Sequence, residues 1–531
     1  MAAFPGSHAG FLSLSNEVLL TVFQLCTSPE RKHRDDTISS LRLTCRRFCQ
    51  LCSDYPVRRC GTFDFSRPES LKLFRRVIDN PRIAEGVREV NVRLHFYHPW
   101  AAASFDNFRA AILSEWVQRV RIFEDPIFLE SGQTTFEDLM RQFVCDMQLH
   151  HDESTKISRS RNTTNQTLCA KDILQQAYKK YKKGYDSQML LHGNGAFAIR
   201  IAWIMTRLPN ISHVRFYDGD LENDVGIVRM FDPIDEQDIL AHRDILEQVL
   251  SRPMLWEEAR WIQPNELIWP GVPTRLLVEI PLALGAEDSL KISKLSVHVS
   301  SAPDYTTMQL SRDDQDKLSN AIKQMGLVQF RFKLRVRVDC GPFISDEEWN
   351  DTVRTASEME VINEYLGAIF NSGCIAHADI NLREFWYSLG LEFTVENARG
   401  LDSIFEAPTP VGIGFTWPSE SDLSSIKLVK VPVTITELRA LVAALGIGAR
   451  ISFSKVCIQV GLWRDALQIL RDGLRDPQPV YISWPLGGGI THLTQDQWVS
   501  IFHSRHTEEG TMAECYVMGK MLDNPLDLAN S

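Results

Sequence analysis

The sequence lacks long apolar runs and has few cysteines. No stretch reaches the roughly 18 consecutive apolar residues that a membrane-spanning helix needs. The opening residues, MAAFPGSHAGF, have neither the basic start nor the apolar core of a secretory signal. The 11 cysteines among 531 residues follow no regular spacing, which indicates reduced thiols rather than a disulfide framework. We therefore expect a cytoplasmic or nuclear protein that does not use a membrane as a partner.

Signatures of the common enzyme classes are absent too. The glycine clusters at 192–195 and 487–489 lack the flanking residues of a phosphate-binding loop, and no G-x-S-x-G, H-E-x-x-H or paired C-x-x-C motif occurs. Cys45, Cys49, Cys52 and Cys60 cluster in the sequence, but Cys45 and Cys52 fall on the apolar side of a predicted helix, where cysteine packs as a small hydrophobic residue. We predict no catalytic residue, no metal site and no cofactor.

One enzymatic alternative stays open. Asp218 and Asp220 follow a predicted strand, and carboxylates at such a position can bind a divalent ion through oxygen. The spacing does not fit a calcium-binding loop, so a solvated turn is the simpler interpretation. A metal-dependent enzyme would need both carboxylates in one cleft.

The charge is unevenly distributed. Hydrophobic residues make up 44% and charged residues 24% of the chain, as in ordinary globular proteins. The formal net charge is −11, yet residues 11–76 carry twelve Lys or Arg against seven Asp or Glu. An acidic body argues against a general nucleic-acid-binding protein, and the basic N-terminal region suits an acidic protein partner.

Residues 11–55 predict two short amphipathic helices. Ser15 is a suitable N-cap for the first helix. Glu17 lies in the first turn, where the helix dipole favours a carboxylate. Apolar residues then recur at helical spacing, and a second helix begins near Asp36 or Thr37 with a similar apolar seam. A module of roughly 40 residues rarely buries enough apolar surface to be stable alone, so we expect a partner surface.

The two half-motifs in this segment, at residues 14–23 and 41–48, resemble the F-box, a module that docks on a Skp-type adaptor. Ser15 stands where the family usually has Pro, Thr44 where it usually has Val, and Phe48 where Trp is common. The layout is similar to that of many F-box proteins of filamentous fungi. The resemblance implies adaptor contacts by one set of side chains: Leu14, Val18, Leu19, Val22, Phe23, Leu41, Leu43, Cys45 and Phe48.

We therefore divide the chain into an F-box-like helical module at 11–60 and an α/β body at 61–531, with a polar surface loop near 150–167. Strand-like runs alternate with helical patterns in the body, at 87–96, 211–217, 276–280, 295–299, 328–338, 375–382, 426–433 and 456–460. The unit at 196–217, a helix that leads through Leu-Pro-Asn into a strand, resembles a leucine-rich repeat. The alternatives are an irregular leucine-rich-repeat-like solenoid and an α+β body with one mixed sheet.

The resemblance implies that this chain is a substrate-receptor subunit of a Skp-cullin-F-box ubiquitin ligase. The module would bind the adaptor, and through it a cullin-RING ligase, while the body would bind an unknown target protein for ubiquitin-dependent degradation. The alternatives are a non-degradative scaffold bound to the adaptor and the metal-dependent enzyme described above.

Overall fold

The structure is a computed structural model. It describes residues 14–26, 47–48, 60–123, 163–192, 195–219, 243–262, 271–300, 302–335, 356–382, 423–476, 479–506 and 510–529. No helix among these residues is long and apolar enough to span a membrane.

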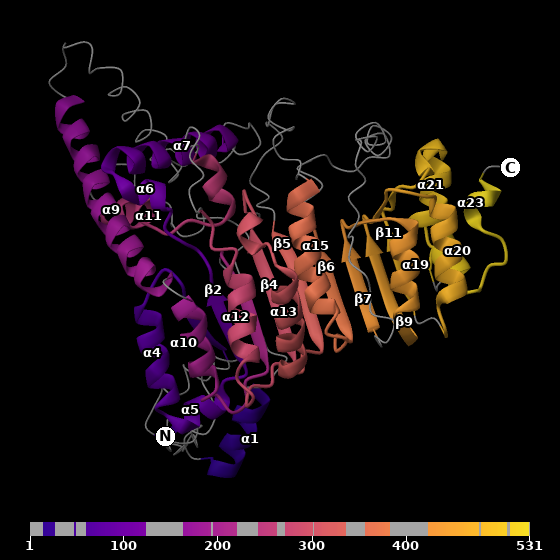
Figure 1. Ribbon diagram of the computed structural model, residues 1–531, viewed down its shortest axis with the longest axis horizontal. Helices are drawn as coiled ribbons and strands as arrows, with labels where there is room; N and C mark the ends of the chain where they lie inside the picture. The colour runs from indigo at the N-terminus through magenta and orange to yellow at the C-terminus, as the bar shows by residue number, and fades with distance from the viewer. Residues whose placement is uncertain are drawn as a thin grey trace, which may run out of the picture.

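A nine-stranded sheet forms the centre of the body (Figure 1). Its strands follow one another in chain order, and every neighbouring pair is parallel. The body is therefore α/β with a large parallel sheet, and the predicted alternative of one mixed sheet is wrong. The strands are β1 (Cys60–Asp64), β2 (Glu89–Arg93), β3 (His213–Tyr217), β4 (Lys294–Ser300), β5 (Gln329–Arg335), β6 (His377–Asn381), β7 (Leu423–Val429), β9 (Leu445–Ser454) and β11 (Val480–Ser483).

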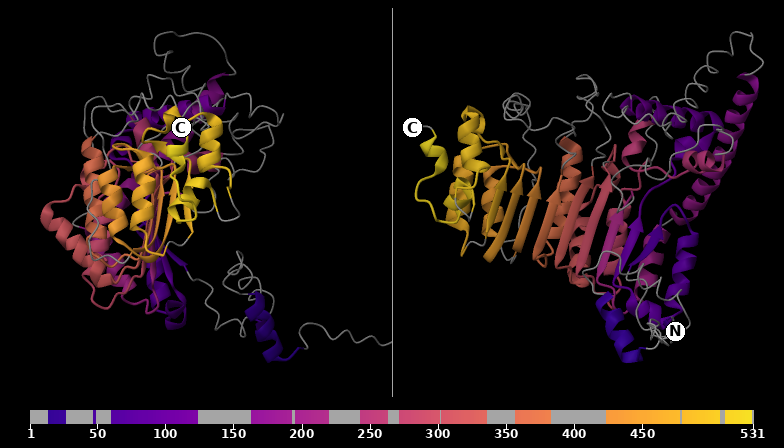
Figure 2. Two further views of the ribbon diagram at one scale, coloured as in Figure 1. Left: turned by 90° about the vertical axis from the view of Figure 1, so that its right-hand side faces the viewer. Right: turned by 180° about the vertical axis from the view of Figure 1, so that it is seen from behind.

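One face of this sheet belongs to the core. Its central row has an apolar side chain on every strand, and none of these is more than 1% exposed. Helices pack over this face, and Figure 2 shows the strands from behind with the helices on the far side. The row, in register across the sheet, is Phe63, Val92, Phe216, Val297, Phe332, Ile380, Leu428, Phe453 and Ile482.

The helices that cover the core face follow the strands in chain order, and one crossing between them depends on glycine. A Cβ on Gly285 would lie 2.3 Å from the Cβ of Ala321, so only glycine permits this approach of α12 and α13. These helices are α4 (Glu69–Ile78), α10 (Ala196–Met205), α12 (Leu276–Gly285), α13 (Arg312–Met325), α15 (Ala356–Phe370), α19 (Ile435–Ala443) and α20 (Trp463–Gly473).

Other helices lie at the ends of the body. The helices α6 (Pro99–Ala103), α7 (Phe105–Phe123), α9 (Thr163–His192) and α11 (Arg243–Leu250) gather beside the carboxyl ends of the first strands (Figure 1). The last strand is followed by α21 (Gln495–Phe502), α22 (Met512–Val517) and α23 (Pro525–Leu528). The short elements α5 (Pro81–Gly86), η7 (Glu257–Trp261), η8 (Thr306–Met308) and η10 (Ile490–His492) lie in connections.

The last three strands of the nine-stranded sheet, β7, β9 and β11, each end in the same kind of sharp turn, which we call a corner. Each is followed at once by a residue in the left-handed region, Lys430, Lys455 or Trp484, with φ of 51°, 55° and 53°. The corner leads to a two-residue strand, which is β8 (Pro432–Val433), β10 (Cys457–Ile458) or β12 (Leu486–Gly487). These form a second parallel sheet in the order β12-β10-β8. The corners are 25 and 29 residues apart, so this part of the body is built from similar consecutive units.

The structure confirms strands within most of the predicted runs, including 211–217, 295–299 and 375–382. The predicted strand at 276–280 is wrong, because these residues begin α12. Their continuous apolar sequence has no period that separates a strand from a buried helix. The predicted polar loop at 150–167 is wrong for 163–167, which begin α9, and its remainder lies outside the described residues. The predicted domain boundary after residue 60 falls within β1.

Candidate functional site: an N-terminal helix and the open face of the sheet

The described part of the N-terminal module centres on α1 (Asn16–Cys26). The Ser15 hydroxyl accepts a hydrogen bond from the backbone N–H of Val18 at 3.4 Å, as predicted for an N-cap. Arg47, from the second predicted helix, reaches back to the start of α1. Its guanidinium donates to the Leu14 carbonyl at 2.7 Å and to the Asn16 side chain at 2.7 and 3.0 Å. The two half-motifs are thus joined by polar contacts.

The side chains predicted to bind an adaptor differ in exposure. Leu19 is fully buried and Phe48 is 3% exposed, so both pack within this chain. Val18 is 47% exposed and is available to a partner. Leu14 and Val22 are half-buried. Phe23 belongs to α1, but its side chain lies outside the described part, as do Leu41, Leu43 and Cys45.

The second candidate site is the open face of the large sheet, opposite the core. Side chains alternate across a strand, so each residue one position before the apolar row points to this face. In register these residues are Thr62, Asn91, Arg215, Ser296, Arg331, Asp379, Lys427, Ser452 and Tyr481, which we call the polar row. No residue of the polar row has an aliphatic side chain, whereas the apolar row has no polar one.

Cations outnumber carboxylates on the open face. Among the described side chains of its strands, the only carboxylates are Asp64, Glu89 and Asp379. The cations, which we call the basic set, are Arg93, Arg215, Lys294, Arg331, Lys333, Lys427 and Arg450. The open face is therefore positive in a chain whose formal net charge is −11.

Two of the carboxylates lie between basic side chains. Glu89 is 3.0 Å from a guanidinium nitrogen of Arg215 and 3.0 Å from His213 Nδ1. Burial works to raise the pKa of Glu89, but His213 and Arg215 together lower it. Asp379 lies 3.0 Å from Lys333 Nζ and 3.5 Å from Arg331 Nε. The face therefore already holds carboxylates between its cations.

The positive charges of the basic set affect one another. Burial lowers the pKa of Lys294, and the neighbouring guanidinium groups of Arg331 and Arg215 lower it further. Lys427 and Arg450, on β7 and β9, are exposed. The side chains of Arg331 and Lys333 are 36% and 30% exposed. An anion bound among these cations would reduce the repulsion between them, and the exposed side chains are accessible to it.

At the carboxyl ends of the strands, the polar side chains form hydrogen bonds that connect neighbouring parts of the fold. The Asp218 carboxylate accepts the backbone N–H groups of Ser300 at 2.8 Å and Trp256 at 2.9 Å, and also the Ser300 hydroxyl. Asp218 is 1% exposed, and burial raises its pKa. It joins β3, β4 and the segment before η7. Asp220, its partner in the enzymatic alternative, lies outside the described residues.

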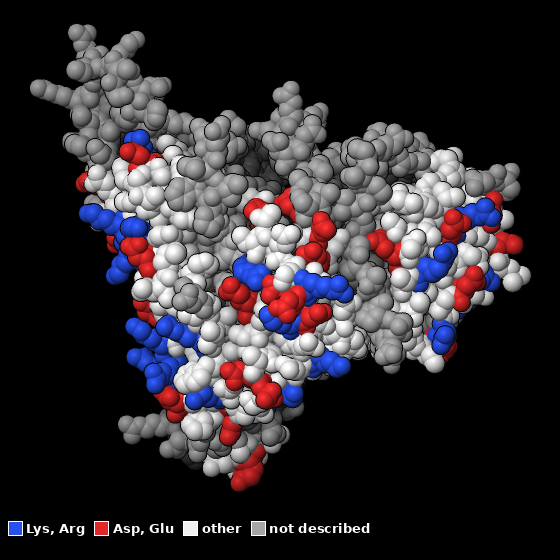
Figure 3. Space-filling view, in the orientation of Figure 1, with Lys and Arg blue, Asp and Glu red and all other residues white. Residues whose placement is uncertain are grey.

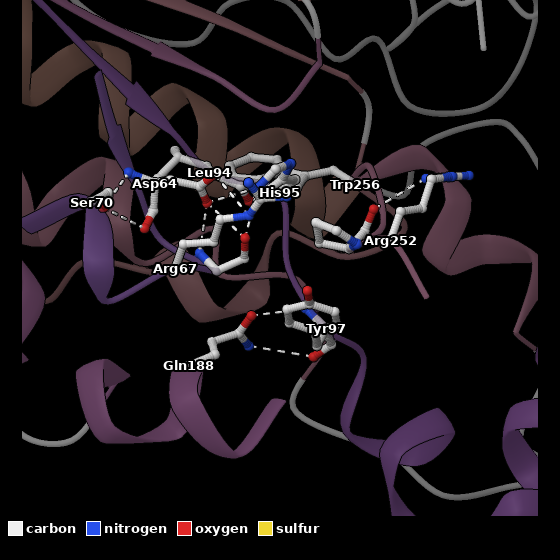
Figure 4. Close-up of polar contacts among 11 residues, drawn as sticks. Asp64, Arg67, Ser70, Leu94, His95, Tyr97, Gln188, Arg252 and Trp256 are labelled. Carbon is white, nitrogen blue, oxygen red and sulfur yellow. Dashed lines mark hydrogen bonds and ion pairs between the residues drawn. The ribbon is translucent and has the colours of Figure 1, made fainter. Parts of the chain in front are cut away.

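A buried Ser–His–Asp cluster of Ser66, His95 and Asp64 lies at the ends of β1 and β2. Figure 4 shows its Asp64 and His95. The Ser66 hydroxyl donates to Asp64 Oδ1 at 2.7 Å, and His95 Nε2 lies 2.7 Å from the same oxygen and 2.8 Å from Ser66 Oγ. Burial lowers the pKa of His95, which favours the neutral ring. Asp64 and Ser66 both approach the same ring nitrogen of His95, whereas in a catalytic triad the carboxylate and the serine contact opposite ring nitrogens. The cluster therefore does not have the geometry of a triad, and its contacts join two strand ends.

Trp256 and Arg252 also lie at the carboxyl ends of these strands (Figure 4). Trp256 is fully buried and donates from its indole to the Leu94 carbonyl at 2.9 Å. Arg252 forms a two-pronged ion pair with Glu258 at 2.7 Å and a further ion pair with Glu115. These contacts fix the connection between β3 and β4 over the sheet edge.

Sequence reasoning missed the basic set because its members are spread from residue 93 to residue 450. Only the strand register places Arg215, Arg331 and Lys427 in one row. The available signal was a Lys or Arg at alternate positions of some predicted strands, such as Arg331 and Lys333 in 328–338. Comparison with known proteins adds no identification: the chain matches no protein-family model, no curated protein and no solved structure.

Proposed function

We propose that this chain is a substrate-receptor subunit of a Skp-cullin-F-box ubiquitin ligase, working in the cytoplasm or nucleus. The N-terminal module would bind the Skp-type adaptor, and the body would hold the target protein. Its support is the F-box-like order of the two half-motifs, together with the Ser15 cap and the contacts of Arg47 with Leu14 and Asn16.

We further propose that the body is an irregular leucine-rich-repeat-like solenoid. Nine parallel strands in chain order and the corners at Lys430, Lys455 and Trp484 support this assignment. The corner spacing of 25 and 29 residues falls in the range of about 20 to 29 residues for such repeats. The connections between the strands before β7 are longer, and for this reason we call the solenoid irregular.

The observation that carries the proposal is the open face of the sheet. Its polar row extends across all nine strands; Thr62, Lys427 and Tyr481 in this row are exposed, whereas Asn91 and Ser296 are buried. Such a surface is suited to holding another protein. The mechanism would be positional: the receptor raises the effective concentration of the target near a ubiquitin-charged enzyme. No catalytic residue is required of this chain.

Co-expression of the full chain with a Skp-type adaptor tests the proposal. We expect a one-to-one complex by co-purification and size analysis, and we expect Val18→Asp to abolish it. Among the predicted contact residues whose side chains the structure describes, Val18 is the exposed one, so the charge enters the interface without entering the core.

Thr21→Asp is the matched control. It places the same charge at another exposed position of α1, one turn from Val18 and outside the predicted contact set, and should leave the complex intact. The proposal is wrong if the wild-type chain forms no complex. Equal binding by the Val18 variant would show that α1 does not provide the interface.

A further inference from the structure

The two faces of the sheet layer differ in charge. On the helix-covered side, Lys and Arg are intermixed with Asp and Glu over α13, whereas Lys and Arg gather over α4 and α10 (Figure 3). On the strands of the open face, seven cations of the basic set oppose three carboxylates. A local excess of positive charge in a chain of net charge −11 does not follow from the average composition.

We infer that the open face binds an acidic peptide segment, rich in Asp and Glu, that crosses the strands along the polar row. This inference rests on the proposed function, since the segment would belong to the target protein. Glu89 and Asp379 already show how this face receives a carboxylate: Glu89 lies beside Arg215 and His213. Asp379 lies beside Arg331 and Lys333. A target carboxylate would find the same chemistry at the exposed cations.

The spacing of the polar row suits an extended peptide. Arg215, Arg331 and Lys427 occupy the row on β3, β5 and β7, every second strand. Parallel strands are about 4.8 Å apart, so these positions repeat at roughly 9.6 Å. In a polyproline II segment every third side chain points the same way, about 9.3 Å apart. Carboxylates at every third residue would therefore meet successive cations.

The observations favour a peptide over a nucleic acid. A long polyanion would be repelled by the acidic remainder of the chain, whereas a short segment meets only the local positive charge. Nucleic-acid surfaces also commonly provide aromatic side chains on which bases stack. The polar row has a single aromatic residue, Tyr481, on the edge strand β11.

Fluorescence anisotropy with the full chain tests the inference. The probe is a labelled peptide of five Glu-Pro-Ser repeats, and the reference peptide has Gln in place of Glu. We expect saturable binding of the Glu peptide, at least about tenfold weaker binding of the Gln peptide, and progressive loss of binding as salt is raised.

The double variant Lys427→Glu, Arg450→Glu should weaken binding of the Glu peptide about tenfold or more, because two attractive contacts become repulsive. The control is Lys323→Glu, Arg439→Glu, which reverses two exposed cations on the helices α13 and α19. Both double variants change the net charge equally. The control should bind as the wild-type chain does, and melting curves should show both variants folded.

Three results would overturn the inference. The first is an equal loss of binding in both double variants. The second is binding of a Gln-Pro-phosphoserine peptide without binding of the Glu peptide. The third is binding of a 15-nucleotide RNA at the same sites more tightly than the Glu peptide. Adaptor binding of the same variants is measured in parallel. An intact adaptor complex without peptide binding rejects this inference alone, and peptide binding without an adaptor complex rejects the proposed function alone.

Discussion

The hydroxyl of Tyr365 donates a hydrogen bond of 3.3 Å to the carbonyl oxygen of Leu277. Leu277 lies four residues before Pro281, which is inside α12 and has no N–H to donate to that carbonyl. A side chain of α15 thus supplies a donor to a carbonyl of α12 in the core. Tyr365 is fully buried, and burial raises its pKa.

Tyr365→Phe should lower the free energy of unfolding by about 1–3 kcal/mol, because it removes a donor from a buried carbonyl. Urea denaturation of the full chain measures the change. Tyr481→Phe is the matched control: Tyr481 is 55% exposed, and its variant should stay within about 0.5 kcal/mol of wild type. Equal stability of the two variants would contradict a role for the Tyr365 hydroxyl.

His98 should make the protein sensitive to acid. It caps α6 by accepting the Trp100 N–H at Nδ1, 3.2 Å away, and burial lowers its pKa from 6.5 to about 4. Because the folded-state pKa is the lower one, the neutral ring's contribution is complete above pH 6.5 and is lost as the pH falls toward 4. The loss can reach about 3 kcal/mol.

His98→Asn separates this effect from other titrations. Asn also accepts a hydrogen bond at an N-cap but does not titrate. Burial lowers the pKa of His95 and His213 as well, and their contribution remains in both proteins. The difference in stability between wild type and variant should therefore change between pH 6.5 and 4. A constant difference over that range would reject the assignment.

The corner at Lys455 should tolerate glycine but not a β-branched residue. Its φ of 55° lies in the left-handed region, where crowding near Cβ is unfavourable. Lys455→Val should lower the free energy of unfolding by about 1–2 kcal/mol, and Lys455→Gly should not. Lys427→Val, within the regular strand β7, is the control for loss of a lysine. No difference between the three variants would show that the corner is unstrained.

Burial of Leu19 separates folding of the N-terminal module from adaptor binding. Leu19→Asp should unfold α1, because an unpaired carboxylate would replace a fully buried side chain at a cost of several kcal/mol. Amide hydrogen exchange of residues 16–26 should then increase. Val18→Asp should lose the adaptor with unchanged exchange. If Leu19→Asp exchanges as wild type does, Leu19 is not part of the module's core.

Local pattern alone predicted the strands whose apolar residues alternate within polar boundaries, such as 211–217 and 375–382. It failed for 276–280, where the continuous apolar run suits a buried strand and a buried helix equally. It also missed β1, a five-residue strand that contains Gly61, whose missing side chain is where Phe74 packs.

The sequence by itself determined the alternation of helices and strands, the cap of α1 and the separation of apolar from polar positions within each strand, since these depend on neighbouring residues. The tertiary structure decided which strands are neighbours. Only that pairing forms the apolar row and the polar row, and only it brings Arg215, Arg331 and Lys427 together across more than 200 residues. The sequence shows which residues are charged, but the electrostatic potential of a surface depends on the distances between those charges, which only the folded chain determines.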